Sequence, residues 1–211
     1  MTDLSARLAA AVKAGFEDQI AFLERLVAIP SVRGAERPAQ ELFAEACRAR
    51  GLETTVAPID LDAIRKHPGF SPIAADYADA LTVVARHAPT CATGRSLVLN
   101  GHMDVVPAGP EAFWTSPPFE PRREGDWLYG RGAGDMKAGL GMTLAALDAL
   151  AACGLRPAAP LTIQAVVEEE STGNGALDAA LRSGPADAAL IPEPMDERLV
   201  RANLGVLWFR L

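Results

Sequence analysis

Short apolar runs of strand length alternate with stretches of helical spacing along almost the whole chain. Apolar residues recur every three or four positions in the helical stretches, whereas the strand-like runs are continuous or alternating. This alternation is typical of an α/β fold, in which a mostly parallel mixed sheet carries helices on both faces. The helical stretches are 4–28, with a break at Gly15, 38–50, 136–152 and 175–183, and the strand-like runs are 52–56, 81–85, 97–99, 127–129, 161–170 and 188–191.

Several of these runs end directly in a histidine or a carboxylate. The apolar run 97–99 is followed by Asn100-Gly101, which we expect to end the strand as a turn, and then by His102. Open α/β sheets keep their sites at the ends of strands, so His102 is a candidate site residue. The other candidates in such places are Asp135 behind a glycine-rich loop, the consecutive Glu168, Glu169 and Glu170, and Glu193 between two prolines.

His102 and Asp104 are two residues apart, which in extended backbone places both side chains on one side, within about 7 Å of each other. A carboxylate in that position can hold one ring nitrogen while the other nitrogen faces a metal ion. A histidine in a polar turn fits the same pair. The pair alone therefore does not decide between a metal ligand and a turn residue.

The acidic residues favour a bound cation, because carboxylates that gather without one repel each other and are driven toward protonation. Zinc accepts histidine nitrogen and carboxylate oxygen, and it keeps a coordination position open in catalytic sites. A solvated acidic surface has no need to place carboxylates directly after apolar strands. Lys137 follows Asp135 closely and is expected either to pair with a carboxylate or to lie on the surface.

Four motifs occur in order along the chain: His102-x-Asp104, the loop Gly-Arg-Gly-x-Gly-Asp135-Met-Lys, the glutamate run with Gly173 and Gly175, and Pro-Glu193-Pro. From about residue 16 to residue 211 the chain resembles the co-catalytic zinc amidohydrolases, the family of acetylornithine deacetylase, succinyl-diaminopimelate desuccinylase, the aminoacylases and the glutamate carboxypeptidases. The resemblance implies a zinc exopeptidase-like catalytic domain with two Zn²⁺ ions, which Co²⁺ or Mn²⁺ can replace. The roles it implies are these: His102 and Glu193 bind one ion, Asp135 bridges both, Glu170 binds the second, Glu169 is the general base and Asp104 orients His102.

The register of the glutamate run has two interpretations. Counting back from Gly175-Ala176, as the family pattern suggests, makes Glu169 the base and Glu170 the ligand, and a shift by one residue makes them Glu168 and Glu169. Neighbouring residues of a regular strand face opposite sides, so the backbone has to leave the sheet here for two consecutive carboxylates to reach one site.

The resemblance implies a metal-dependent hydrolase that cleaves the amide bond of an N-acyl amino acid or a related small N-acyl amine. The sequences of residues 67–72 and 169–175 resemble acetylornithine deacetylase-like enzymes more than dedicated peptidases. A metallo-exopeptidase acting on dipeptides uses the same kind of metal site and stays an alternative. A non-catalytic metal-binding or dimerisation module is a third possibility, although a structural site has no use for the spare carboxylate of a general base.

Residues 1–198 are expected to form the N-terminal portion of the catalytic domain. Residues 199–211, with a strand pattern from residue 200 to residue 211, resemble the start of a lid or dimerisation domain. The second metal is one histidine short, because His67 is expected in an exposed loop and His87 at a strand end on the surface. We therefore expect the remaining ligand and lid beyond these residues, a homodimer for the full-length protein, and no activity for the 211 residues alone.

Composition excludes some partners. The formal net charge is −7, from 20 basic and 27 acidic residues, and no basic run is present, which disfavours nucleic acid as a partner. No segment has the length and apolar character of an export signal or a membrane span. The three cysteines are far apart, odd in number and in no Cys-x-x-Cys pair, so we expect reduced thiols in core or helix and a cytoplasmic protein.

Overall fold

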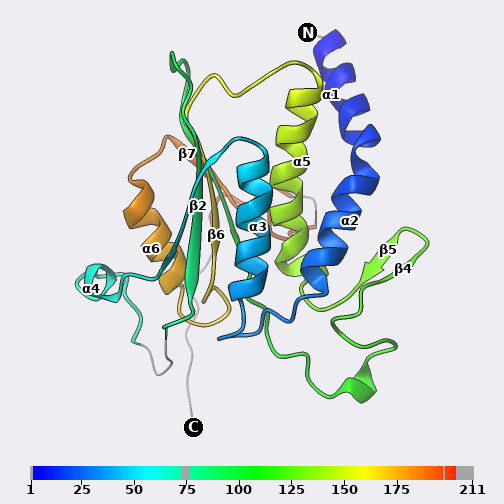
Figure 1. Cartoon of the computed structure of the whole chain (residues 1–211), viewed down its shortest axis with the longest axis vertical. Helices are drawn as coiled ribbons and strands as arrows, with labels where there is room; N and C mark the ends of the chain where they lie inside the picture. The colour runs from blue at the N-terminus through cyan, green and yellow to red at the C-terminus, as the bar shows by residue number, and fades with distance from the viewer. Residues whose placement is uncertain (1, 73–76, 197, 203–211) are drawn as a thin grey trace.

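The structure, a computed structural model, describes residues 2–72, 77–196 and 198–202. Its middle layer is a five-stranded sheet with the order β1-β2-β6-β3-β7 (Figure 1). The strands are β1 (Glu53–Pro58), β2 (Leu81–His87), β3 (Leu97–His102), β6 (Leu161–Val166) and β7 (Ala188–Leu190).

Four of these five strands run in the same direction. β3 is parallel to both of its neighbours, β6 and β7. β2 is antiparallel to both β6 and β1, so β1 again points the same way as β6. The expected mostly parallel mixed sheet is confirmed, with β2 as its antiparallel member.

Helices cover both faces of the sheet, as predicted. On one face lie α3 (Arg37–Ala49) and α5 (Ala138–Ala152), with α1 (Thr2–Ala14) and α2 (Phe16–Val27) packed outside α5 (Figure 1). On the other face lie the short α4 (Leu61–Ile64) and α6 (Asn174–Ser183). The break that the sequence predicts at Gly15 separates α1 from α2.

The main core lies between the sheet and α3 and α5. Burying apolar side chains of this kind contributes roughly 1.5–3 kcal/mol each. This layer fixes the sheet against α5, which holds the loop that carries Asp135. Its fully buried members include Leu26, Phe43, Val83, Met103, Leu140, Leu144 and Ile163.

The predicted turn at Asn100-Gly101 is wrong, because β3 continues through both residues to His102. A side-chain carbon on Gly101 would lie 2.9 Å from Leu140 Cδ2 and from Met136 Cε. The glycine is therefore needed for the close approach of α5 to the strand rather than for a turn. As a result His102 is held by the sheet itself.

The stretch between β3 and α5 contains a short turn η1 (Glu111–Phe113) and a two-stranded hairpin. β4 (Arg122–Glu124) pairs antiparallel with β5 (Trp127–Tyr129), of which only the second strand was predicted. Among the described cysteines Cys91 is exposed outside the helices and strands, contrary to the expected core or helix position.

Most of the strand predicted from residue 200 to residue 211 lies outside the described residues, which include only 200–202 of it. Within the part of the chain that the structure describes, no helix combines the length and the apolar character needed to cross a membrane.

Candidate metal centre

His102 is the last residue of β3 and is 1% exposed. Its Nδ1 lies 2.8 Å from the main-chain oxygen of Asp104. A carbonyl only accepts hydrogen bonds, so Nδ1 carries the proton and Nε2 keeps its lone pair for a ligand. The sequence interpretation gave this contact to the Asp104 carboxylate, but that carboxylate is 3.6 Å from Nδ1 and the main-chain oxygen holds the ring.

Asp135 faces the free nitrogen of this ring. It lies in the irregular turn η2 (Ala133–Lys137), where the Asp135–Met136 peptide bond is cis, and its Oδ1 is 2.9 Å from His102 Nε2. The preceding Gly132 has φ +78°, and a side-chain carbon there would lie 2.4 Å from Val105 Cγ1. Glycine is therefore required for this loop to pass so close to the residues that follow β3.

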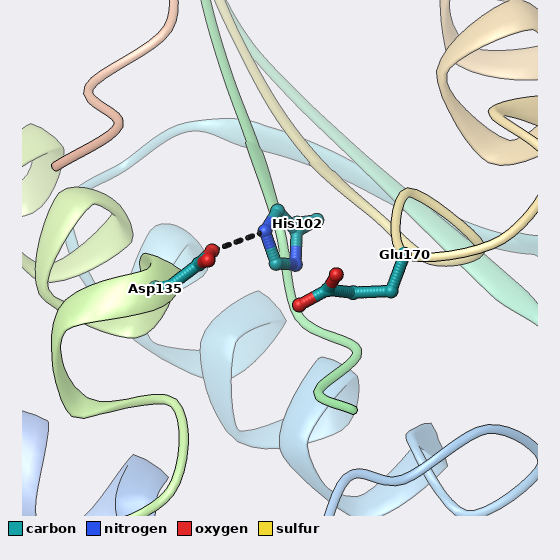
Figure 2. A group of neighbouring side chains, drawn as sticks. All are labelled: His102, Asp135 and Glu170. Carbon is teal, nitrogen blue, oxygen red and sulfur yellow. Dashed lines mark hydrogen bonds and ion pairs between the residues drawn. The ribbon is translucent and has the colours of Figure 1, made fainter. Parts of the chain in front are cut away.

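Glu170 approaches the same point from the end of β6. Figure 2 shows His102 between the carboxylates of Asp135 and Glu170. One ligand atom of each residue can be chosen so that all three lie within 4.8 Å of one another. Protein ligands bind zinc at about 2.0–2.2 Å through nitrogen or carboxylate oxygen, so this group is compact enough to converge on a metal ion.

Glu169 and Glu193 complete the ring of carboxylates. Oε2 of Glu169 and Oε1 of Glu193 are each 3.7 Å from His102 Nε2. A side-chain carbon on Gly139 would lie 2.4 Å from the carbonyl oxygen of Pro192. The absence of a side chain at the start of α5 thus lets the segment after β7 bring Glu193 into the site.

The charges in this ring are not balanced by the protein. Burial, followed by repulsion from Asp135, Glu169 and Glu170, raises the pKa of Glu193 to about 6, although His102 acts the other way. Burial also raises the pKa of Glu170, and the charge of Asp135 adds to this effect. Within the described ranges, none of these four carboxylates forms an ion pair with a lysine or arginine.

The ring of His102 responds to the same charges. Burial lowers its pKa, but the Asp104 charge, the bonded main-chain oxygen of Asp104 and the charges of Glu169 and Glu193 together raise it above the usual value. An imidazole nitrogen among carboxylates, with no basic side chain beside them, is the donor set of a divalent metal ion. The residues present fit a metal ion.

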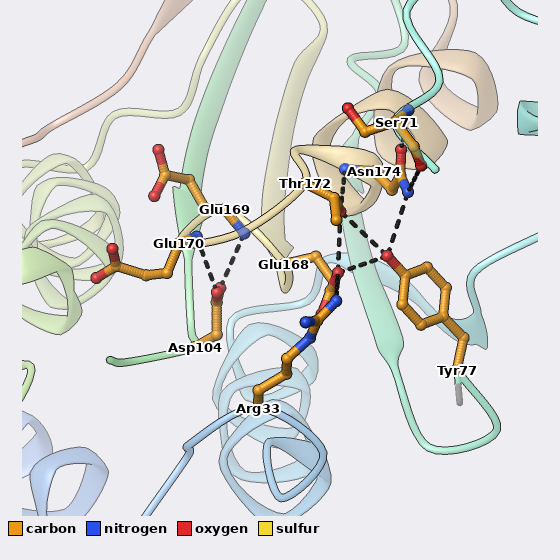
Figure 3. Close-up of polar contacts among 9 residues, drawn as sticks. All are labelled: Arg33, Ser71, Tyr77, Asp104, Glu168, Glu169, Glu170, Thr172 and Asn174. Carbon is orange, nitrogen blue, oxygen red and sulfur yellow. Dashed lines mark hydrogen bonds and ion pairs between the residues drawn. The ribbon is translucent and has the colours of Figure 1, made fainter. Parts of the chain in front are cut away.

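The carboxylate of Asp104 holds the glutamate run in place, whereas its main-chain oxygen contacts the ring. Its Oδ2 accepts a hydrogen bond from the main-chain N–H of Glu170 at 3.1 Å, and its Oδ1 lies 3.4 Å from the N–H of Glu169 (Figure 3). Burial raises the pKa of Asp104, and His102 and these amides oppose that effect. The contact from Asp104 to the ring thus comes from its main-chain oxygen, and the role of Asp104 in orienting His102 stays a prediction.

Glu168 points away from this site. Its carboxylate accepts hydrogen bonds from Arg33, Tyr77 and Thr172 instead of facing His102. Of the two registers left open by the sequence, only the pair Glu169 and Glu170 brings both carboxylates to the site. Figure 3 shows these two side chains pointing away from Glu168. Their roles as base and ligand stay predictions.

Lys137 contradicts both sequence expectations, since it is fully buried and pairs with no carboxylate in the part of the chain that the structure describes. Its Nζ donates to the main-chain oxygens of Leu26 at 2.8 Å and Ile29 at 2.9 Å, and burial lowers its pKa to about 8. It thereby ties the end of α2 to the turn that carries Asp135. A sequence signal existed, because Lys137 is in helical phase with the buried Leu140 and Leu144.

The sequence analysis did not identify Arg33 and Tyr77, and no local pattern marks either of them as a residue near the site.

The two remaining histidines lie outside the site, as expected. The ring of the exposed His67 accepts from the N–H of Gly69 in its own loop, and His87 ends β2 with its Nε2 2.9 Å from the Pro157 oxygen.

Comparisons with known proteins agree with these motifs. A family model described as peptidase family M20/M25/M40 matches residues 98–204. A succinyl-diaminopimelate desuccinylase from Variovorax paradoxus is 34% identical over 151 residues, which are 71% of this chain and 35% of that protein. Another from Alkalilimnicola ehrlichii is 39% identical over 122 residues, which are 55% of this chain and 32% of that protein.

Among solved structures, the fold is similar to a di-peptidase from Saccharomyces cerevisiae with a TM-score of 0.71 and 20% identity, over 88% of this chain and 40% of that one. The chain spans about a third of the length of the curated relatives described above. With the family model matching about half of its residues, including His102, Asp135 and Glu193, the chain belongs to peptidase family M20/M25/M40.

Proposed function

We propose that the protein containing this chain is a metal-dependent hydrolase that cleaves the amide bond of an N-acyl amino acid or a related small N-acyl amine. Membership of the peptidase family supports hydrolysis, and the desuccinylase relatives favour an acyl group on an amino acid as the target. The observation that carries the proposal is the convergence of Asp135, Glu169, Glu170 and Glu193 on His102, with none of the described lysines or arginines paired to these carboxylates.

In this proposal the site takes two zinc ions, for which cobalt or manganese can stand in, and the second ion lacks one histidine ligand among the described residues. His102 and Glu193 would hold one ion, Glu170 the other, and Asp135 both. When bound, the ions supply Lewis acidity to the attacking water and to the amide carbonyl. This assignment leaves the carboxylate of Glu169 free, and a purely structural metal site would have no use for it.

Glu169 is the residue that moves the proton. Its side chain is 49% exposed, so solvent and substrate can reach its carboxylate. A carboxylate oxygen of Glu169 takes a proton from the attacking water as the carbon–oxygen bond forms, and it returns the proton to the nitrogen of the departing amine as the carbon–nitrogen bond breaks. Asp104 keeps the main chain of Glu169 in reach by accepting from its N–H.

The test is Glu169→Gln in the full-length natural protein. We expect unchanged zinc content and a fall in kcat of roughly 10²–10⁴-fold, since that is the usual contribution of a positioned general base. Glu53→Gln, at an exposed position of β1, is the matched control and should keep full activity. Near-normal turnover of Glu169→Gln, with its zinc retained, would reject the role.

The substrate class is tested with zinc- or cobalt-loaded protein on a panel of N-acylated amino acids and dipeptides. Preference for N-acyl amino acids supports the proposal, preference for dipeptides makes the protein an exopeptidase, and no turnover of either class supports the non-catalytic module. The homodimer, the cytoplasmic location and the inactivity of the 211 residues alone stay predictions. Light scattering, fractionation of cells and a parallel assay of the 211-residue chain check them.

A further inference from the structure

A second polar cluster lies directly behind the carboxylates that face His102. At its centre is Glu168, whose side chain is 2% exposed. Arg33 donates to this carboxylate from Nε and, at 2.6 Å, from Nη2. The hydroxyls of Tyr77 and Thr172 donate to Oε2, the latter at 2.9 Å (Figure 3). Both oxygens of Glu168 are therefore satisfied by the protein itself.

The backbone at Glu168 is in an unfavourable conformation for its residue type. Its φ is +70°, in the left-handed region that non-glycine residues avoid. Its main-chain oxygen accepts from the N–H groups of Thr172 at 2.9 Å and Gly173 at 2.8 Å, which closes a turn around the glutamate run. Such a conformation persists only where the surrounding contacts hold it.

This turn decides which carboxylates reach the site. In a regular strand Glu168 and Glu170 would face one side and Glu169 the other. The left-handed residue breaks this alternation, so that Glu168 enters the polar cluster while the side chains of Glu169 and Glu170 point away from it (Figure 3). Those two side chains face His102. The glutamate run is thus held from two sides. Asp104 accepts hydrogen bonds from its main-chain N–H groups, and Arg33 donates to the Glu168 carboxylate.

We propose that Arg33 is a positioning residue for the metal centre. Its two parallel hydrogen bonds to Glu168 hold the strained turn, and the turn in turn aims Glu169 and Glu170 at His102. Arg33 lies between α2 and α3, 135 residues before Glu168, so the link exists only in the folded chain. The effect on turnover rests on the proposed function of Glu169, whereas the effect on the turn does not.

Arg33→Ala in the full-length protein tests the hold on the turn, and Arg37→Ala is the matched control. Arg37 also donates from Nε and Nη2 to a carboxylate, that of Asp79, and the two arginine side chains are 44% and 42% exposed. We expect amide hydrogen exchange of residues 168–173 to become at least 10-fold faster in Arg33→Ala and to stay unchanged in Arg37→Ala. Exchange as slow in Arg33→Ala as in the unmodified protein would overturn the proposal.

Steady-state kinetics of the zinc-loaded variants give the second readout. Misaiming Glu169 should lower kcat at least 10-fold and leave KM within about 2-fold, because a displaced general base weakens the transition state more than it weakens substrate binding. Ethylguanidinium added to Arg33→Ala should restore part of kcat. The kcat of Arg33→Lys should lie between those of Arg33→Ala and the unmodified protein, because lysine keeps the charge but lacks the planar fork. A change in KM alone would overturn the proposal.

The two proposals fail in different ways. If Glu169→Gln keeps normal turnover, the proposed function fails, and the exchange of residues 168–173 still decides whether Arg33 holds the turn. If Glu169→Gln is inactive but Arg33→Ala has unchanged exchange and unchanged kcat, the positioning role fails and the proposed function stands.

Discussion

Glu168 and Glu170 are two positions apart in one turn, yet their carboxylates lie in opposite electrostatic environments. Burial acts to raise the pKa of Glu168, but hydrogen bonds from Arg33, Tyr77 and Thr172 outweigh it and lower the pKa below the usual value. Burial raises the pKa of Glu170, and the neighbouring charge of Asp135 raises it further. The first carboxylate has its donors within the protein, whereas the second has no such donor among the described residues.

The contrast shows that hydrogen-bond donors around a carboxylate, and not burial alone, distinguish a carboxylate that stabilises the fold from one that is available to a ligand. A carboxylate that is supplied with a guanidinium and hydroxyls stabilises the fold around it. Carboxylates that converge without donors destabilise the metal-free protein and gain energy when a metal ion binds. Three predictions sharpen or break this comparison.

The largest effect is expected for Asp135→Asn at the unbalanced cluster. Zinc affinity should fall by at least about 1,000-fold, roughly 4 kcal/mol, because loss of a ligand costs more than the 10–100-fold seen for residues behind ligands. Isothermal titration calorimetry with zinc measures it. Asp148→Asn, which removes an exposed partner of Arg50 on α5, is the control and should bind zinc as before. Equal affinities would show that the ring around His102 is not the metal site.

An intermediate effect is expected for Glu36, which is 1% exposed and has no hydrogen-bond partner for Oε2 among the residues described. Burial, with smaller effects from Asp104 and Glu168, raises its pKa from 4.5 to about 7. Between these two pH values the folded protein keeps a proton that the unfolded chain has lost. The free energy of unfolding should therefore fall as the pH rises, by about 3 kcal/mol in all.

Urea unfolding from pH 4 to pH 8 measures this slope. Glu36→Gln cannot lose the proton, so its stability should fall less over the same range and exceed that of the unmodified protein at pH 8. Parallel pH profiles of unfolding free energy for the two proteins would show that Glu36 is ionised at little cost. That result would weaken the distinction between carboxylates with and without hydrogen-bond donors from the protein.

The smallest effect concerns the two glutamates themselves in metal-free protein. Glu168→Gln should lower the free energy of unfolding by about 2 kcal/mol, because it removes charge-assisted hydrogen bonds and leaves the Arg33 guanidinium without its partner. Glu170→Gln removes a repelling charge and should leave stability unchanged or raise it by less than about 1 kcal/mol. Urea unfolding in the presence of a chelator compares them, and a loss of equal size in both variants would break the comparison.

Much of the fold follows from local patterns. The 3.6-residue spacing of apolar residues gives α2, α3 and α5 within a few residues of their observed bounds, because each helix buries one continuous stripe. His102, Glu170 and Glu193 follow the strand-like runs that form β3, β6 and β7, and they are candidates for one site because the carboxyl ends of parallel strands meet at one edge. Asp135 follows β5 of the separate hairpin and reaches the site through the turn η2. The predicted turn at Asn100-Gly101 was wrong because Gly101 is needed for close packing against α5. That packing depends on tertiary distances, which the sequence does not give.

The sequence by itself determined the α/β architecture and the set of acidic residues that gather near His102, because strand and helix periodicity and the ends of strands are local properties. Only the tertiary structure decided which two of three consecutive glutamates face His102. That choice depends on the left-handed backbone of Glu168 and on Arg33, which is 135 residues away along the chain. The burial of Lys137 likewise depends on main-chain oxygens of Leu26 and Ile29 that reach it only after folding.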